Sequence, residues 1–402
     1  MPKKNDDFFK EKKPWSEVKD ELLECYLKPY IQKVLHTRKP IVYVDCFAGK
    51  GVFEDGKPGS PIIALRTISD CLGQTKMNLC TVQRFFIDLN YADDLRENTK
   101  DYEGIKIISG KYEENIDGIL CDKTGCNVFL YVDPYGIKAL DHRLFVKFST
   151  CYKFNSIELL INMNSFGFIR EGCRVLGGDF DNESMFEDLV EYDNTRLDTS
   201  EKSVIALNEI AGGDYWKAII ESYKQNKKTI YEAEEQFAAQ YCERLRQSYK
   251  YVLNMPLKIK RGQLPKYRMI HTTNHVEGCL LMVDNICGRW ELMANIQNNG
   301  QKQLWEENCN NQIIDDEDIK RKVIQLTSNY SGFTRLNYVL ADFFMKYGPI
   351  CSTKAVKDIY RDLENNGNID VQRNSAFTEI TGQPSKFFAD EKEKKTELRW
   401  RA

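Results

Sequence analysis

The sequence lacks any apolar run long enough to cross a membrane. A spanning helix needs about 18 to 20 consecutive apolar residues, and the longest runs here lie at 157–163 and 279–283. Residues 1–13 are rich in charge and no apolar stretch follows them, so we expect no signal peptide. We therefore expect a cytoplasmic protein without membrane contact.

Paired cysteines and clustered histidines are also lacking. The 402 residues include 13 cysteines without a Cys-x-x-Cys pair, and 4 histidines that lie apart in the sequence. An odd number of scattered cysteines behind no leader indicates reduced thiols rather than disulfides. Without the ligand spacing of a zinc module, we predict no metal site.

An excess of charge of either sign is missing as well. Lys and Arg (57) nearly balance Asp and Glu (60), so the formal net charge is −3, which excludes a uniformly basic protein. Affinity for nucleic acid must then come from local patches. Hydrophobic residues (42%) and charged residues (29%) are near the globular average, which excludes disordered and collagen-like classes. At roughly 150 residues per domain the length indicates two to three domains.

The sequence does contain alternating strand-like and helix-like segments. Uninterrupted apolar runs are typical of buried parallel strands, and helix-length segments between them indicate a doubly wound α/β sheet. Two further strand-like runs would add an antiparallel pair at the edge, giving seven strands. The seven runs lie at 41–44, 84–89, 105–108, 128–132, 157–163, 249–259 and 267–274.

The chain is expected to divide into successive parts. The C-terminal part shows helix, helix, tight turn and strand, the components of a winged-helix-like α+β module. The expected parts are a helical lead-in (1–40), the sheet domain (41–297) with an acidic, helical insertion (170–247), a polar linker (298–318) and the winged-helix-like module (319–402).

The segment Asp45-Cys-Phe47-Ala-Gly49-Lys-Gly51 follows the first strand directly. In a doubly wound sheet this is the ligand end of the strand, and glycines there allow close approach to a ligand. Phe47 replaces the first glycine of a dinucleotide motif, and no Gly-Lys-Ser/Thr follows. The alternative is a simple turn with two glycines.

Two more strands end in an acid. Asp88 occupies the position that captures ribose hydroxyls in nucleotide-like ligands, although such an acid can also cap the next helix. Asp133-Pro134-Tyr135-Gly136 offers oxygens that could accept from a substrate amine and a ring that could stack on a base, although it also makes a good turn. Three acid-terminated strands of one sheet are expected to converge on one rim.

Together these motifs resemble those of class I S-adenosylmethionine-dependent methyltransferases. They are most similar to the amino-methylating branch, whose members carry Asp/Asn-Pro-Pro-Tyr or Asp-Pro-Phe-Gly at the third position. Over residues 10–290 the chain also resembles the three-Cys-motif partner family (TcmP). The segments that carry this second resemblance are Gly59-Ser-Pro61, Leu159-Leu-Ile-Asn162, Arg170, Gly212-Gly-Asp-Tyr-Trp216 and Ile270-His-Thr-Thr-Asn-His-x-x-Gly278.

The resemblance implies a seven-stranded Rossmann-like methyltransferase sheet with S-adenosylmethionine as cofactor. It implies a role on nucleic acid beside a radical-SAM-like three-Cys-motif partner protein, in bacterial or phage DNA or RNA modification or defence. Residues 109–111 lack the acid that often contacts the cofactor adenine, which is a departure from related enzymes. The implied roles are cofactor binding by Asp45, Phe47, Gly49 and Gly51 (methionine part) and Asp88 (ribose), and presentation of the acceptor amine by Asp133, Pro134 and Tyr135.

A basic segment is the expected nucleic-acid contact. Residues 244–276 contain eight Lys and Arg, no carboxylate, and interleaved tyrosines, which is the combination that binds single strands or a flipped base. The alternative is a sheet edge protected by lysines. The predicted contact residues are Lys258, Lys260, Arg261, Lys266 and Arg268.

The sequence therefore predicts a methyltransferase that acts on an exocyclic base amine. The alternative is a catalytically inactive, nucleic-acid-binding partner subunit with the same fold.

Overall fold

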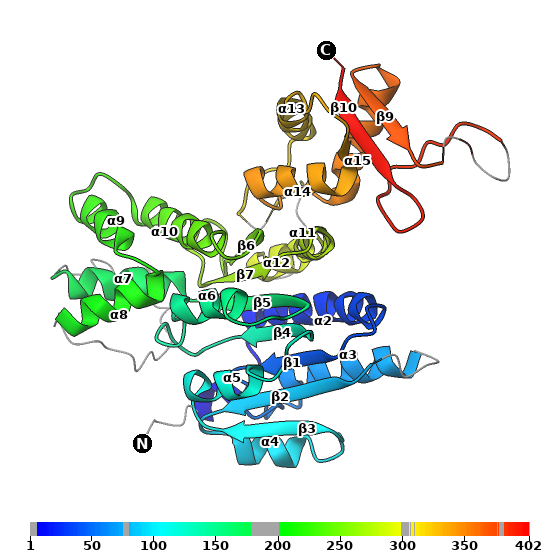
Figure 1. Ribbon diagram of the computed structural model, residues 1–402. Coiled ribbons are helices and arrows are strands. Elements are labelled where there is room, and N and C mark those ends of the chain that lie inside the picture. Colours follow the sequence, from blue (N-terminus) through cyan, green and yellow to red (C-terminus); the bar gives the residue numbers. More distant parts are fainter. Residues whose placement is uncertain are drawn as a thin grey trace.

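In the computed structural model a seven-stranded sheet forms the centre of the protein (Figure 1). Its strand order is β3-β2-β1-β4-β5-β7-β6; the first five strands along the chain run parallel, and β7 is antiparallel to β5 and β6. This confirms the predicted α/β fold and the antiparallel pair at one edge. The strands are β1 (Ile41–Asp45), β2 (Val82–Asp88), β3 (Ile105–Ser109), β4 (Asn127–Val132), β5 (Ser156–Met163), β6 (Tyr251–Leu257) and β7 (Tyr267–Thr273).

The structure describes most of the chain. The described residues are 6–74, 80–177, 201–298, 305, 307–308, 310–375, 377 and 382–401.

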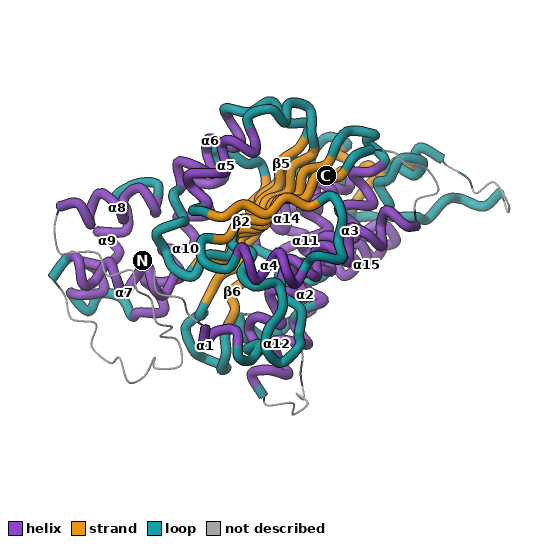
Figure 2. The backbone as a smooth tube through the Cα atoms, turned by 90° about the horizontal axis from the view of Figure 1, so that it is seen from below, coloured by secondary structure: helices purple, strands orange, loops and turns teal. Residues whose placement is uncertain are grey.

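Both faces of the sheet are covered by helices (Figure 2). On β1, Ile41 and Tyr43 belong to one hydrophobic core, whereas Val42 and Val44 belong to the other. Because successive side chains of a strand point to opposite faces, a strand buried on both sides requires the uninterrupted apolar runs seen in the sequence.

The helices divide between the two faces. Those on the face of Tyr43 are α2 (Pro14–Leu35), α3 (Ser60–Gln74), α4 (Ala92–Asn98), α11 (Val276–Gly288) and α12 (Trp290–Gln297). Those on the face of Val44 are α5 (Tyr112–Leu120), α6 (His142–Thr150), α7 (Ser165–Val175), α8 (Glu201–Ala211), α9 (Tyr215–Lys224) and α10 (Ile230–Leu245). No helix in these described ranges is both long enough and apolar enough to span a bilayer.

The predicted insertion at 170–247 is helical where it is described. It includes the end of α7, then α8, α9 and α10, and α10 begins with a capping box of Thr229 and Glu232. Most of its predicted acidic residues lie at 179–198, outside the described residues. Helix α7 begins at Ser165, so helical structure starts before the predicted boundary.

The C-terminal elements form a second, smaller sheet. They are α13 (Asp316–Thr327), β8 (Thr334–Arg335), α14 (Leu336–Tyr347), α15 (Thr353–Asn365), β9 (Ile369–Arg373) and β10 (Thr396–Trp400), with sheet order β8-β10-β9. Of these elements, α14, α15 and β9 correspond to the two helices and the strand that the sequence predicts. Helix α13, which begins within the predicted linker at 298–318, and the strands β8 and β10 were not predicted.

The smaller sheet and its helices pack on the main domain. Side chains of α14 and α15 share one continuous core with α2 and α11. Asp284 on α11 accepts hydrogen bonds from the backbone N–H of Thr353 (2.8 Å) and from its hydroxyl (2.7 Å), at the start of α15. The C-terminal elements lie at the end of the molecule opposite β3 and α4 (Figure 1).

A buried polar cluster ties α2 and α11 to the sheet. Glu158 on β5 is 3% exposed and accepts hydrogen bonds from the hydroxyls of Tyr26 and Thr273, and His271 lies 3.2 Å from it. Gly278 on α11 packs so closely that a Cβ there would lie 2.6 Å from the carboxylate. The cluster therefore fixes both helices relative to β5.

Candidate functional site

A cavity lies at the carboxyl end of the parallel strands. The topological switch point is at β1, which pairs with β2 on one side and β4 on the other, and ligands of doubly wound sheets bind outside such a point. The cavity itself is small, about 60 Å³, and it opens to solvent. Six of the eight predicted cofactor and catalytic residues line it, namely Phe47, Gly49, Gly51, Asp133, Pro134 and Tyr135.

The loop after β1 depends on its glycines. Gly49 and Gly51 adopt φ angles of +62° and +80°, a region that side chains disfavour. A Cβ at Gly49 would lie 2.9 Å from the ring of Phe9, and one at Gly51 would lie 2.8 Å from Leu95. The glycines therefore permit both the backbone turn and the close approach of neighbouring groups.

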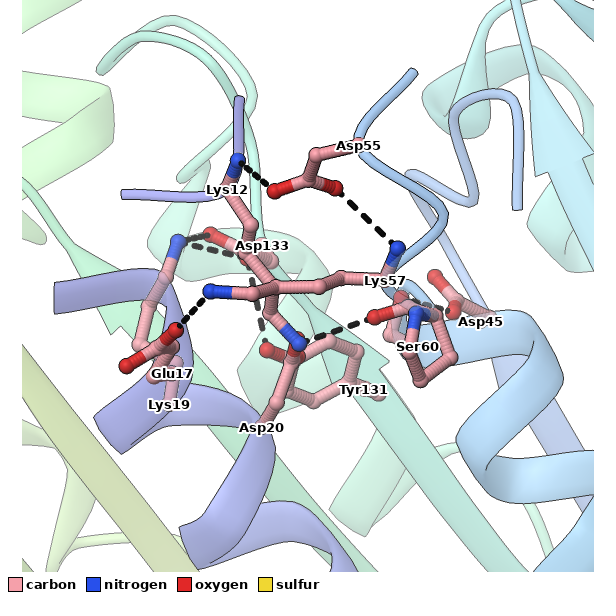
Figure 3. Close-up of polar contacts among 11 residues, drawn as sticks. Lys12, Glu17, Lys19, Asp20, Asp45, Asp55, Lys57, Ser60, Tyr131 and Asp133 are labelled. Carbon is pink, nitrogen blue, oxygen red and sulfur yellow. Dashed lines mark hydrogen bonds and ion pairs between the residues drawn. The ribbon is translucent and has the colours of Figure 1, made fainter. Parts of the chain in front are cut away.

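Asp45 stabilises this loop through hydrogen bonds. Its buried carboxylate accepts hydrogen bonds from the Phe47 N–H (3.2 Å) and from the Ser60 hydroxyl (2.7 Å, Figure 3). Burial raises the pKa of Asp45 to about 7. Asp45 does not itself line the cavity, whereas Phe47 and Ser60 do.

Asp88 also contacts the loop rather than the cavity. Its carboxylate accepts from three backbone N–H groups: Gly49 at 2.8 Å, Asn90 at 2.8 Å and Tyr91 at 2.6 Å. It therefore links the end of β2 to the glycine loop and to residues 90–91, which lead into α4. Its role toward a ribose stays a prediction.

Asp133 lies in a hydrogen-bonded network inside the cavity. Lys19 on α2 donates to both of its carboxylate oxygens, at 3.0 and 2.8 Å (Figure 3). Asn162 donates to one oxygen at 2.6 Å and the Tyr131 hydroxyl to the other at 3.3 Å. Lys19 and Asn162 line the cavity, but neither was among the site residues predicted from the sequence.

The N-terminal segment lies across the cavity. Phe8, in α1 (Asp6–Phe9), packs edge to face on Tyr135 with ring centroids 5.3 Å apart, and Phe9 packs on Tyr91 at 4.9 Å. Tyr135 remains 43% exposed. The only signal of this contact in the sequence is a pair of adjacent aromatic residues within a charged segment.

Lys12 anchors this segment. Its ammonium lies 2.5 Å from Asp20 on α2 and donates to the Pro58 carbonyl at 2.8 Å. The Glu54 N–H donates to the Phe9 carbonyl at 2.8 Å. Burial raises the pKa of Asp20 to about 6, and the neighbouring Lys12 ammonium partly opposes this rise.

The predicted nucleic-acid surface is corrected at Arg268 and Lys266. Arg268 is 1% exposed and pairs with Glu234 at 2.6 and 2.7 Å and with Glu235 at 2.6 Å. Lys266 is 3% exposed, and its ammonium lies 3.7 Å from the centre of the Trp15 ring. Neither cation faces solvent, because both lie on or beside β7 within the core of the sheet.

The three remaining basic residues lie nearer the surface. Lys260 and Arg261 are exposed, while Lys258 is half-buried and donates to the Asn310 carbonyl at 3.2 Å. Arg261 pairs with Glu307, a carboxylate from outside the basic segment. The interleaved tyrosines do not form a stacking surface, because Tyr249, Tyr251 and Tyr267 are all buried.

No family model and no curated protein matches the chain. Among solved structures, a Legionella pneumophila protein of the family model DUF519 aligns with 71% of this chain and 94% of its own, at 11% identity and a TM-score of 0.39. CurJ carbon methyltransferase aligns with 62% of this chain and 54% of its own, at 12% identity and a TM-score of 0.30. Likenesses at this level carry no argument, so the fold assignment rests on the strand order and register given above.

Proposed function

We propose that the protein is an S-adenosylmethionine-dependent methyltransferase that acts on an exocyclic amine of a nucleic-acid base. One observation carries the proposal: the glycine loop after β1 and the Asp133-Pro134-Tyr135 turn after β4 line the same cavity at the switch point. The segment expected to bind the cofactor and the segment expected to bind the acceptor therefore lie next to each other.

The lining of the cavity suits the methionine end of the cofactor. Asp20 and Asp133 contribute carboxylates to the lining, where they pair with Lys12 and Lys19, respectively. Gly49 and Gly51 expose backbone for close contact. When bound, the cofactor supplies an electrophilic methyl group, and positioning of the acceptor provides most of the rate gain in such a transfer.

Asp45 and Asp88 would act from outside the lining of the cavity, since both contact the glycine loop. Asp45 and Phe47 hold the shape of the loop that would bind the methionine part. Asp88 accepts three N–H groups, and a carboxylate has about four acceptor positions, so one stays available for a ribose hydroxyl.

The acceptor would enter beside Tyr135. A base must leave its stack to reach a catalytic pocket, and stacking on an aromatic side chain recovers part of the energy. Tyr135 is exposed enough to provide that surface. Lys258, Lys260 and Arg261 are the candidate phosphate contacts, together with the winged-helix-like C-terminal module.

We further propose that the protein works with a three-Cys-motif radical-SAM-like partner in bacterial or phage nucleic-acid modification or defence. This part of the proposal rests on the resemblance of the sequence to the TcmP family.

A catalytically inactive nucleic-acid-binding subunit is the second candidate. The packing of Phe9 against Gly49 favours it, because this ring fills space next to the glycine loop. The ion pair between Lys19 and Asp133 favours it too, because it engages the carboxylate expected to orient an amine.

A transfer assay separates the two candidates. The purified protein is incubated with methyl-labelled S-adenosylmethionine and total DNA or RNA, with and without the partner protein. The enzyme should transfer label to nucleic acid. If folded protein binds nucleic acid but transfers no label under any of these conditions, the inactive-subunit function replaces the enzyme.

A further inference from the structure

The carboxylate of Asp133 has little acceptor capacity left. A carboxylate offers about four lone-pair positions. Lys19 donates to both oxygens, Asn162 donates to Oδ1 and the Tyr131 hydroxyl donates to Oδ2. An amine entering the cavity would have to displace one of these donors to reach Asp133.

Asn162, in contrast to Asp133, keeps an acceptor atom that no described residue engages. It is 2% exposed, and its Oδ1 has no hydrogen-bond partner among the described residues. Its orientation is fixed chemically, since an ionised carboxylate only accepts. The amide nitrogen must therefore face Asp133, which leaves the amide oxygen on the other side. A buried acceptor without a partner is costly, and a ligand that donates to it would remove that cost.

The strand register places Asn162 beside the acceptor turn. Val132 at the end of β4 pairs with Ile161 on β5, so the next residues along the two parallel strands, Asp133 and Asn162, are neighbours. Asn162, Pro134 and Tyr135 all line the same cavity. Asn162 and the acceptor turn thus belong to one site.

We propose that Asn162 Oδ1 is the group that accepts a hydrogen bond from the acceptor amine, and that Asp133 and Lys19 are positioning residues that hold the Asn162 amide in this orientation. The inference rests on the proposed methyltransferase function and refines it. It moves the amine-orienting role from the side chain of Asp133 to that of Asn162.

The substrate class follows from this arrangement. A primary amine such as that of adenine or cytosine can donate to Asn162 Oδ1 while its nitrogen lone pair faces the methyl group. In the transfer, that lone pair forms the new N–C bond, and the electrons of the broken S–C bond stay on the sulfur of S-adenosylmethionine. A proton then leaves the methylated nitrogen for water.

Two substitutions at Asn162 provide the kinetic test. Asn162→Leu removes the acceptor oxygen with little change in volume, and we expect kcat to fall by about 100-fold or more with KM changed much less. Asn162→Asp keeps an oxygen in place, but it adds a second carboxyl beside Asp133, whose charge Lys19 already neutralises, and the neighbouring carboxylate favours the protonated form of the new carboxyl. Its activity should therefore be highest at low pH and decline as pH rises.

A buried asparagine elsewhere serves as the matched control. Asn285 on α11 is 8% exposed and donates to the Leu22 carbonyl at 2.8 Å, away from the cavity. Asn285→Leu should lower thermal stability but leave kcat unchanged. If Asn162→Leu keeps kcat within about threefold of the wild type, or if Asn162→Asp is as impaired as Asn162→Leu at every pH, the inference is wrong.

A binding experiment tests the inference without catalysis. With S-adenosylhomocysteine present, calorimetry compares adenosine with purine riboside, which lacks the amine. The wild type should prefer adenosine by about 10-fold or more, and Asn162→Leu should lose this preference. A wild type that binds both nucleosides equally overturns the role of Asn162, whereas failure to bind S-adenosylhomocysteine at all overturns the proposed function instead.

Discussion

Replacing Asp45 with asparagine should make the stability of the protein less sensitive to pH. Burial raises the pKa of Asp45 from 3.8 to about 7. Between these two values the folded protein keeps a proton on Asp45 that the unfolded chain has released. The free energy of unfolding of the wild type therefore falls as pH rises through this window.

The size of the effect follows from the pKa rise. A rise from 3.8 to about 7 corresponds to about 4 kcal/mol at one pKa unit per 1.36 kcal/mol. Roughly 2 to 3 kcal/mol of this falls between pH 5 and pH 8. Asparagine can still accept from the Phe47 N–H and donate to the Ser60 hydroxyl, so the loop should keep its shape.

Urea unfolding of both proteins at pH 5 and pH 8 measures this difference. We expect the stability of Asp45→Asn relative to the wild type to increase by roughly 2 to 3 kcal/mol from pH 5 to pH 8. Comparing the two proteins at each pH cancels the titration of groups that they share. If the relative stability stays constant or decreases, Asp45 is not a buried acid with a raised pKa.

Three further substitutions test other parts of the structure. Gly278→Ala should destabilise the protein by ~1 to 3 kcal/mol in urea unfolding, because its Cβ would meet the Glu158 carboxylate. Gly288→Ala in the same helix is the control, because its Cβ would meet nothing within 4 Å. Equal destabilisation by both substitutions would contradict the close packing at Gly278. Arg268→Met should lower the free energy of unfolding by ~3 to 5 kcal/mol, since it leaves the buried Glu234 carboxylate without its ion-pair partner. An unchanged melting temperature together with weaker nucleic-acid binding would instead assign Arg268 to the binding surface. Phe9→Ala should speed association of S-adenosylhomocysteine by ~10-fold in stopped-flow measurements, because a larger fraction of the protein would have an open cavity. A slower association rate in this variant would show that the Phe9 ring helps to bind the ligand.

Local pattern was enough to predict the sheet and the position of the cavity. An uninterrupted apolar run such as that of β1 is typical of a strand buried on both faces, and the carboxyl ends of parallel strands lie at one edge of the sheet. The sequence therefore predicts the glycine loop and the Asp133 turn at the same edge of the sheet, and the structure brings both into one cavity.

Some site residues were not predicted, and some basic residues were wrongly predicted to lie on the surface, because their positions depend on contacts between distant parts of the chain. Lys19 lies in the predicted helical lead-in (1–40), yet it pairs with Asp133, 114 residues away. Arg268 was grouped with neighbouring cations because its segment contains no acid, but α10 brings Glu234 to it from 34 residues away. Charge in sequence thus predicts a surface only when the strand carrying it is not covered by other elements.

The role of Asn162 could not be predicted from the sequence pattern, because it depends on an amide oxygen that lacks a hydrogen-bond partner among the described residues. The residue was noticed as part of a resemblance, but its role depends on which of its atoms is engaged. That information comes from the register of β4 and β5 and from the hydrogen bond to Asp133.

Calorimetric titration with S-adenosylhomocysteine tests the central claim most directly. The wild type should bind one molecule per chain, and Gly49→Ala should weaken binding by about 10-fold or more, equivalent to about 1.4 kcal/mol. Gly56→Ala is the matched control, because Gly56 has a similar φ of +81° but no neighbour within 4 Å, so it introduces the same backbone strain away from the cavity. Specific loss of binding in the Gly49 variant is the result that a methyltransferase site predicts. Absence of binding to folded wild-type protein at millimolar ligand would contradict it.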